Sequence, residues 1–92
     1  MRFKFDAKKS DTLRSNPKRG IGFEEAQEIF SLPYYLDQRV DRPTQYRAIG
    51  WVRGRLYAIV FEIGTDSAGE FYHPVTLWKA TAEEEKLYEE NL

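Results

Sequence analysis

Residues 46–63, YRAIGWVRGRLYAIVFEI, predict a β-hairpin that decides the fold class. Two runs rich in β-branched and aromatic residues, Tyr46–Val52 and Leu56–Ile63, lie on either side of Arg53-Gly54. Glycine favours the tight turn that joins two antiparallel strands. Because both runs are apolar on either face, we expect the two strands to lie in the centre of a sheet.

Further strands are predicted outside this hairpin. Met1–Asp6 alternates between apolar and polar residues, which is typical of a short strand. Tyr34–Leu36 predicts a second short strand, which a polar loop over Asp37–Pro43 follows. Phe71–Trp78 predicts the last strand. Its Pro74 has no N–H to donate and therefore indicates an edge position or a bulge.

Two helices are predicted between the first and second strands. Asp6 is a favourable N-cap for a short helix over Ala7–Leu13. Residues 14–20, which contain proline and glycine, predict a loop. Phe23–Ser31 places apolar residues on one face and glutamates on the other, which predicts a second helix that Pro33 ends.

A third helix is predicted at the C-terminus. Thr81 and Glu84 form a Thr-x-x-Glu capping box, which opens a helix through about Glu90. The fold class is therefore α+β, a small antiparallel sheet of four to five strands with two N-terminal helices and one C-terminal helix. We expect the helices to cover one face of the sheet.

Length and composition favour one cytoplasmic domain over residues 1–92. The apolar fraction of 41% and the aromatic fraction of 15% can supply a core. The absence of cysteine excludes a disulfide scaffold, a cysteine zinc site and a cysteine nucleophile. We expect no membrane association, because no apolar run approaches the roughly 18 residues of a membrane helix and the N-terminus lacks a signal-peptide core.

Charge is distributed unevenly along the chain although its net value is only −1. Residues 1–19 contain seven lysines and arginines against two aspartates, whereas residues 79–92 contain two lysines against five glutamates. A basic N-terminal region can meet phosphates, and an acidic helix repels them. Both regions could equally be solvated surfaces, and the near-neutral total argues against a strong RNA binder.

Most catalytic chemistries lack their residues in this sequence. One histidine and scattered carboxylates show no zinc or calcium spacing, and neither a phosphate-binding loop nor a nucleophile elbow is present. We therefore expect neither a metal nor a cofactor. What remains is a set of basic and aromatic side chains.

Arg47, His73 and Lys79 are the candidate functional residues in that set. Arg47 lies in an apolar strand, so it either forms a partly buried ion pair, for example with Glu62, or projects toward a phosphate. His73 is either structural or an acid–base group, because its ordinary pKa is near neutrality. Lys79 donates either to a scissile phosphate or to solvent. Metal-free RNA cleavage needs a base, an acid and cations around the phosphorane, which such residues can supply.

Several segments, taken in order, resemble the BrnT family of ribonuclease toxins over nearly the whole chain. They are Phe3–Lys9, Asn16–Ala26 with its Gly20-Ile-Gly-Phe-Glu-Glu-Ala26 stretch, Tyr46–Gly50, Leu56–Phe61, and Val75–Thr81 followed by Glu84 and Tyr88. The sequence departs from the family pattern at Trp78 and near His73, where the family has arginine. It departs again at Arg19, where the family has histidine.

The resemblance implies a RelE-like fold and an mRNA-cleaving toxin that halts translation. It also implies a cognate DNA-binding antitoxin of BrnA type, in a homodimer or a toxin–antitoxin hetero-oligomer, so that DNA is reached only through the antitoxin. In that function Arg47 and Lys79 would contact RNA phosphate, His73 would be the acid or base, and Tyr88 would contribute.

A second hypothesis is a non-catalytic binding module, a co-repressor or degenerate toxin that keeps the fold and the antitoxin interface. The neutral charge and the lost arginine favour this module, whereas the whole-chain resemblance favours the toxin. A positive concave sheet face around Arg47, His73 and Lys79 would support cleavage. A flat apolar patch alone would support the binding module.

Overall fold

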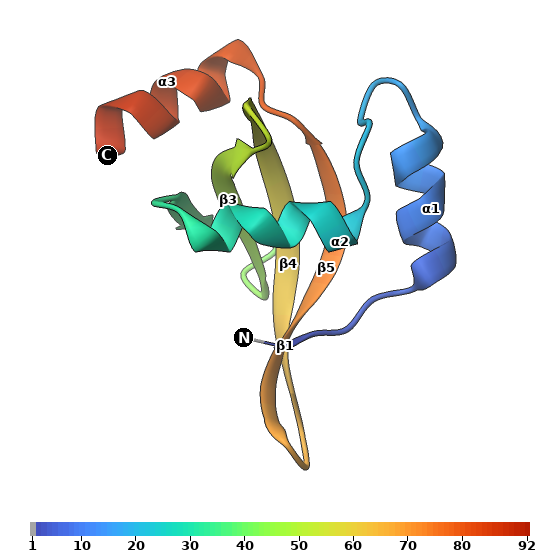
Figure 1. Ribbon diagram of the computed structural model, residues 1–92. Coiled ribbons are helices and arrows are strands. Elements are labelled where there is room, and N and C mark those ends of the chain that lie inside the picture. Colours follow the sequence, from blue (N-terminus) through green and yellow to red (C-terminus); the bar gives the residue numbers. More distant parts are fainter. Residues whose placement is uncertain (1) are drawn as a thin grey trace.

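The computed structural model, which describes residues 2–92, has the predicted α+β fold with one five-stranded sheet (Figure 1). Met1, with which the predicted first strand begins, lies outside the described residues. The strands follow one another in space in the order β1-β5-β4-β3-β2. Their bounds are Arg2–Phe3 for β1, Tyr35–Gln38 for β2, Gln45–Val52 for β3, Arg55–Asp66 for β4 and Gly69–Lys79 for β5.

The helices lie at both ends of the chain, as predicted. They are α1 (Ala7–Ser15), α2 (Phe23–Ala26), the 3-10 helix η1 (Gln27–Ser31) and α3 (Ala82–Asn91). The helix predicted over Phe23–Ser31 is thus one α-helical turn that tightens into a 3-10 helix, and it ends before Pro33 as expected. None of the helices in residues 2–92 is long and apolar enough to cross a membrane.

The predicted central hairpin is confirmed. β3 and β4 pair antiparallel from Gln45 opposite Glu62 to Val52 opposite Arg55. At the turn, Arg53 has φ +50° and Gly54 has φ +84°, and two positive φ angles characterise the tight turn that matches strand twist. β4 is the middle strand of the sheet, which explains why its residues are apolar on both faces.

Two details of the predicted sheet are wrong. The sheet is not wholly antiparallel, because β1 pairs parallel with β5. Two helices separate β1 from β2 in the chain, so the rule for strands joined by short turns does not apply to β1. In addition, Asp37 and Gln38 belong to β2 rather than to the following loop, since they pair with Arg47 and Tyr46 of β3.

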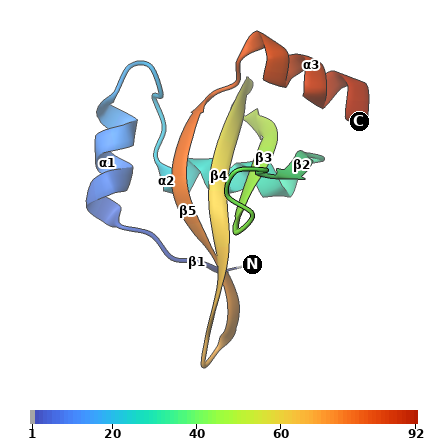
Figure 2. The same ribbon diagram turned by 180° about the vertical axis from the view of Figure 1, so that it is seen from behind.

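The helices cover both faces of the sheet, so the expectation of one covered face is also wrong. α1, α2 and η1 contribute Leu13, Phe23 and Ile29 to a core with Ile59 and Phe61 on the first face. On the second face, Tyr88 of α3 packs against a smaller cluster of Ile49, Leu56 and Ala58. Figure 2 shows that α3 lies only at one end of the sheet.

A bulge in β5 explains Pro74. Val60 pairs with Thr76, and its neighbour Phe61 pairs with Pro74, so that Val75 has no direct partner on β4. On its other edge, β5 pairs with β1 only at Phe71 and Tyr72. The prediction of an edge position or a bulge at this proline is confirmed, and within residues 2–92 no strand pairs with the outer edge of β5 beyond Tyr72.

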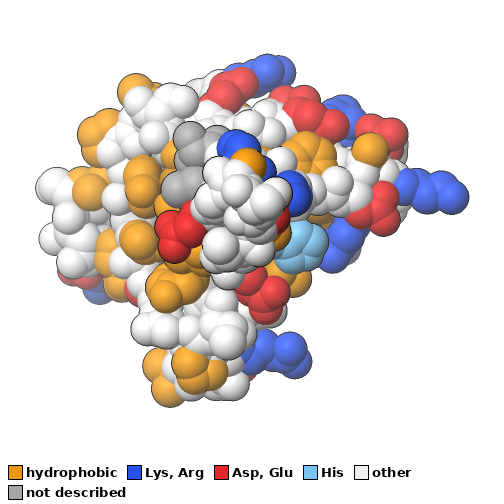
Figure 3. Space-filling view, turned by 90° about the horizontal axis from the view of Figure 1, so that it is seen from below, with side chains coloured by type: hydrophobic (Ala, Val, Ile, Leu, Met, Phe, Trp, Pro, Cys, Tyr) orange, Lys and Arg blue, Asp and Glu red, His pale blue; other side chains and the backbone are white. Residues whose placement is uncertain are grey.

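The β4–β5 hairpin projects beyond the rest of the sheet, and ion pairs fasten its tip. Arg2 donates to Asp66 at 2.7 Å, and Lys4 pairs with the same carboxylate. These two cations hold the pKa of Asp66 well below its ordinary value. In Figure 3, which faces this end, basic and acidic side chains lie side by side. The tip is therefore a charge-balanced surface rather than a single-sign patch.

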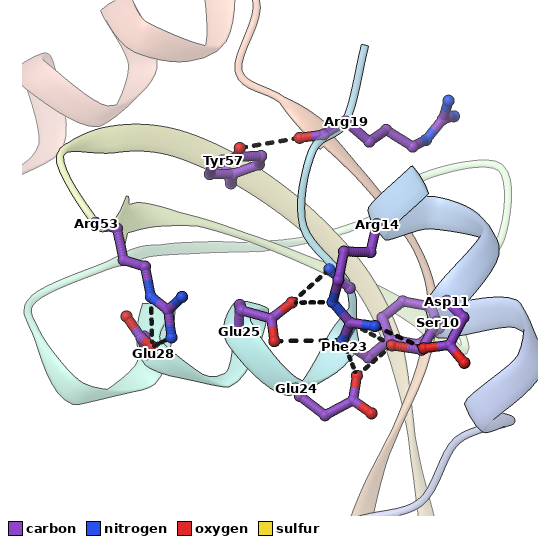
Figure 4. Close-up of polar contacts among 11 residues, drawn as sticks. Ser10, Asp11, Arg14, Arg19, Phe23, Glu24, Glu25, Glu28, Arg53 and Tyr57 are labelled. Atoms are coloured by element: carbon purple, nitrogen blue, oxygen red, sulfur yellow. Dashed lines mark hydrogen bonds and ion pairs between the residues drawn. The ribbon is translucent and has the colours of Figure 1, made fainter. Parts of the chain in front are cut away.

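A second ion network joins α1 to α2 (Figure 4). Arg14 lies 2.6 Å from Asp11, 2.7 Å from Glu24 and 2.9 Å from Glu25. Ser10, which is fully buried, donates to Glu24 and accepts from the Phe23 N–H at 2.8 Å. The Ser10 hydrogen bond lowers the pKa of Glu24, and the Arg14 hydrogen bond lowers the pKa of Glu25.

These lowered pKa values predict acid sensitivity of the α1–α2 junction. Above the ordinary glutamate pKa of 4.5 the stabilisation is fully present, and it is lost as the pH falls toward the folded-state values. Arg14→Gln should therefore reduce the drop in melting temperature between pH 7 and pH 3, measured by circular dichroism. Arg55→Gln, which removes an exposed cation without an ion pair in the described chain, should leave that drop unchanged. An unaltered pH profile in Arg14→Gln would contradict this assignment.

Candidate functional site

Arg47 projects from β3 onto the second face of the sheet, where two carboxylates hold it. Its Nη2 lies 2.5 Å from Oδ2 of Asp37, and its Nε lies 3.0 Å from Oδ1 of the same residue. Its Nη1 lies 3.3 Å from Oε2 of Glu84. Hydrogen bonding to Asp37 raises the pKa of Arg47. Of the two alternatives for Arg47, an ion pair or a contact with phosphate, the structure has the ion pair.

The suggested partner Glu62 was wrong, and the strand register gives the reason. Arg47 stands opposite Val60 on β4 and opposite Asp37 on β2, whereas Glu62 stands opposite Gln45. Side chains directly opposite one another on neighbouring strands are the ones that meet. With two carboxylates around one guanidinium, the surroundings of Arg47 are negative rather than positive, which disfavours a phosphate there.

Glu84 connects Arg47 on β3 to Trp78 on β5. Its side chain is buried, with a residue exposure of 4%. Its Oε1 accepts from the Trp78 indole N–H at 2.8 Å and from the Thr81 N–H at 3.0 Å, so the predicted capping box is confirmed. The arrangement fixes the start of α3 on the second face of the sheet.

His73 lies on the same face as Arg47, at the projecting end of the sheet. It stands opposite Glu62 and is exposed (pale blue in Figure 3). Its Nδ1 lies 2.9 Å from the carbonyl oxygen of Lys4. Because a carbonyl only accepts, this contact places the proton on Nδ1 and leaves Nε2 as the basic nitrogen of the neutral ring.

Lys79 lies on the opposite face from Arg47 and His73. It pairs with Tyr57, whose side chain belongs to the core beneath the N-terminal helices. Six residues of strand separate Lys79 from His73, which is roughly 20 Å at about 3.3 Å per residue. The two side chains therefore do not converge on one phosphate.

Tyr88 lies apart from these residues on α3. Its hydroxyl donates to the Pro33 carbonyl at 3.1 Å, and its ring meets Trp51 edge-on with centroids 6.2 Å apart. Tyr88 thus ties α3 to the segment before β2. The four candidate residues are distributed over both faces of the sheet and over α3, so the anticipated positive face around Arg47, His73 and Lys79 does not form.

The structure instead brings Lys79 together with the loop between α1 and α2. The Lys79 ammonium donates to the Pro17 carbonyl at 3.1 Å, and Arg19 Nε donates to the Leu77 carbonyl at 2.8 Å. The Tyr57 hydroxyl donates to the Arg19 carbonyl at 2.9 Å (Figure 4). These bonds fasten the loop to the unpaired outer edge of β5.

We call Lys18, Arg19 and Lys79 the edge cluster. Within residues 2–92, no carboxylate lies within ion-pair distance of any of the three. Figure 4 shows the Arg19 guanidinium extending away from the Arg14 network. The edge cluster is thus a local excess of positive charge, in contrast to Arg14 and Arg47, which carboxylates neutralise.

The sequence contained part of the signal for this cluster. The excess of lysine and arginine in residues 1–19 includes Lys18 and Arg19. Their proximity to Lys79 depends on how the loop closes onto β5, across about sixty residues of chain, and no local pattern encodes that closure. The sequence therefore made no prediction that Arg19 lies near Lys79, and it marked Arg19 only as a difference from the BrnT pattern.

The part of the chain that the structure describes has no group of three His, Asp or Glu side chains arranged to hold a metal ion. Comparison with protein-family models finds no match, and comparison with curated proteins finds no match either. The functional argument therefore depends on the residues and their geometry.

Replacing Arg47 tests whether it is structural. Arg47→Met should lower the free energy of unfolding by about 2 kcal/mol, because it leaves Glu84 buried without its cation. Removing one partner of a fully buried ion pair costs roughly 3–5 kcal/mol, and the loss is smaller here because Arg47 is partly exposed. Lys79→Met removes a cation that has no carboxylate partner and should change stability by less than about 0.5 kcal/mol. Urea denaturation measures both, and an equal loss in the two variants would overturn the distinction.

Proposed function

We propose that this protein is a BrnT-type toxin, a metal-independent endoribonuclease that cleaves mRNA and is neutralised by a BrnA-type antitoxin. The whole-chain sequence resemblance supports the class. The observation that carries the proposal is the edge cluster, in which Lys18 is exposed and Arg19 and Lys79 are half-buried, and in which none of the three has a carboxylate partner among the described residues. An uncompensated group of cations is what an RNA phosphate requires.

The edge cluster can stabilise a charged phosphorane. Arg19 uses only its Nε in binding the Leu77 carbonyl, so its two terminal nitrogens can take two phosphate oxygens together. Lys79 uses one of three ammonium protons for the Pro17 carbonyl, and it can donate another to the 5′-oxygen that leaves as the 2′-oxygen attacks. The proton of the attacking 2′-hydroxyl would pass to a water molecule. Each side chain is held by one hydrogen bond to a backbone carbonyl, which reduces the reorganisation needed when charge develops.

A non-catalytic binding module is the second candidate, and one observation favours it. The edge cluster has no histidine or carboxylate to take the 2′-hydroxyl proton, since His73 lies roughly 20 Å away on the other face. A protein with this cluster alone would bind RNA, or an acidic segment of its antitoxin, without cleaving it. DNA would be reached only through the antitoxin in either case.

Controlled expression with a charge-matched control distinguishes the two candidates. Wild type should arrest growth and fragment mRNA, and Arg19→Gln/Lys79→Gln should do neither. Lys8→Gln/Lys9→Gln removes the same charge from exposed positions on α1 and should remain toxic. Soluble, folded wild-type protein that leaves growth and mRNA intact would exclude the ribonuclease and favour the binding module.

The salt dependence of RNA binding by the purified protein tests whether the edge cluster contacts the RNA phosphates. Each phosphate contact with single-stranded RNA contributes about 0.7 to the slope of log K against log salt. Arg19→Gln/Lys79→Gln should therefore reduce that slope by about 1.4, and Lys8→Gln/Lys9→Gln should reduce it less. Equal slopes in the two double variants would show that the edge cluster is not the phosphate site.

A further inference from the structure

A pocket of about 270 Å³ lies on the second face of the sheet, next to the start of α3, where Glu84 contacts two of its lining residues, Arg47 and Trp78. Its lining includes Asp37 on β2, Arg47 on β3, Val60 on β4 and Trp78 on β5. It therefore extends across four strands. Arg39 and Asp41, on the loop after β2, complete one wall.

The lining combines an apolar floor with balanced charge. Val60 is almost fully buried, and Trp78 presents an indole ring whose N–H Glu84 already accepts. The two arginines and two aspartates cancel, and they pair with one another, Arg47 with Asp37 and Arg39 with Asp41 at 3.6 Å. Such a pocket does not favour a phosphate, but it offers donors, acceptors and an aromatic surface to an uncharged planar ring.

The pocket and the edge cluster are close along one strand. Trp78 and Lys79 are consecutive in β5, and consecutive side chains of a strand point to opposite faces. Arg19 binds the carbonyl of Leu77, the residue before Trp78. A single strand of RNA that passes around this end of β5, where the loop between α1 and α2 is fastened, would thus pass from cations on one side to an aromatic pocket on the other.

We propose that this pocket binds one nucleobase of single-stranded RNA, with Trp78 as its stacking surface and Arg39 at its rim. The inference rests on the proposed function, since it assigns a base-recognition site to an RNA whose phosphate lies at the edge cluster. The volume supports a single ring system, because pockets for larger ligands occupy roughly 300–1,000 Å³. Stacking on an aromatic side chain is the common means of holding an unpaired base.

Fluorescence of Trp78 tests the pocket directly. Trp51→Phe leaves Trp78 as the only tryptophan, and titration with adenosine, guanosine, cytidine and uridine reports stacking as saturable quenching. We expect at least one nucleoside to quench the emission. In the same Trp51→Phe protein, Arg39→Ala should lower the affinity for that nucleoside at least fivefold. Arg42→Ala, an exposed arginine on the same loop that does not line the pocket, should leave the affinity within twofold.

The outcomes separate the pocket from the proposed function. Nucleosides carry no phosphate, so Arg19→Gln/Lys79→Gln should bind them as wild type does even when it no longer binds RNA. Saturable quenching in a protein that cleaves no RNA would support the pocket and reject the ribonuclease. RNA cleavage with no saturable quenching by any nucleoside, or equal weakening by Arg39→Ala and Arg42→Ala, would overturn the pocket alone.

Discussion

The carboxylate of Glu84 lies buried at the start of α3, and groups from three parts of the chain satisfy it. Trp78 reaches it from the end of β5, Thr81 from the N-cap of α3 and Arg47 from β3. A buried carboxylate without such partners would destabilise the fold by several kcal/mol, so these contacts determine where α3 can lie. Because α3 is anchored at this end, it covers the cluster of Ile49, Leu56 and Ala58, and the pocket lies beside the anchor at Arg47 and Trp78.

The basic side chains fall into two groups with different physical roles. Arg2, Arg14 and Arg47 each pair with carboxylates, and they join β1 to the hairpin, α1 to α2, and β3 to β2 and α3. Lys18, Arg19 and Lys79 hydrogen-bond through backbone or side-chain N–H groups only to uncharged oxygens. A neutralised cation stabilises the fold, whereas an uncompensated cation can attract an anion. This difference moves the candidate site away from Arg47 to the outer edge of β5.

Both candidate functions, the ribonuclease and the binding module, would use the surface that contains the uncompensated cations. In the proposed function the edge cluster would hold the RNA backbone, and the pocket beside Trp78 would hold a base. Trp78 anchors α3 through Glu84, and in the proposed function it would also be the stacking surface for the base.

The sequence by itself determined the elements whose signals are local. Two β-rich runs around the Arg53-Gly54 turn predicted the central hairpin, Thr81 and Glu84 predicted the start of α3, and Pro74 predicted an edge position or a bulge. Each of these depends on residues within a few positions of one another, so backbone geometry decides them. Only the tertiary structure decided the partner of Arg47, the opposite faces of His73 and Lys79, and the meeting of Arg19 with β5. A shift of one residue in strand register moves every side chain to the other face, and the register follows from packing across the whole sheet.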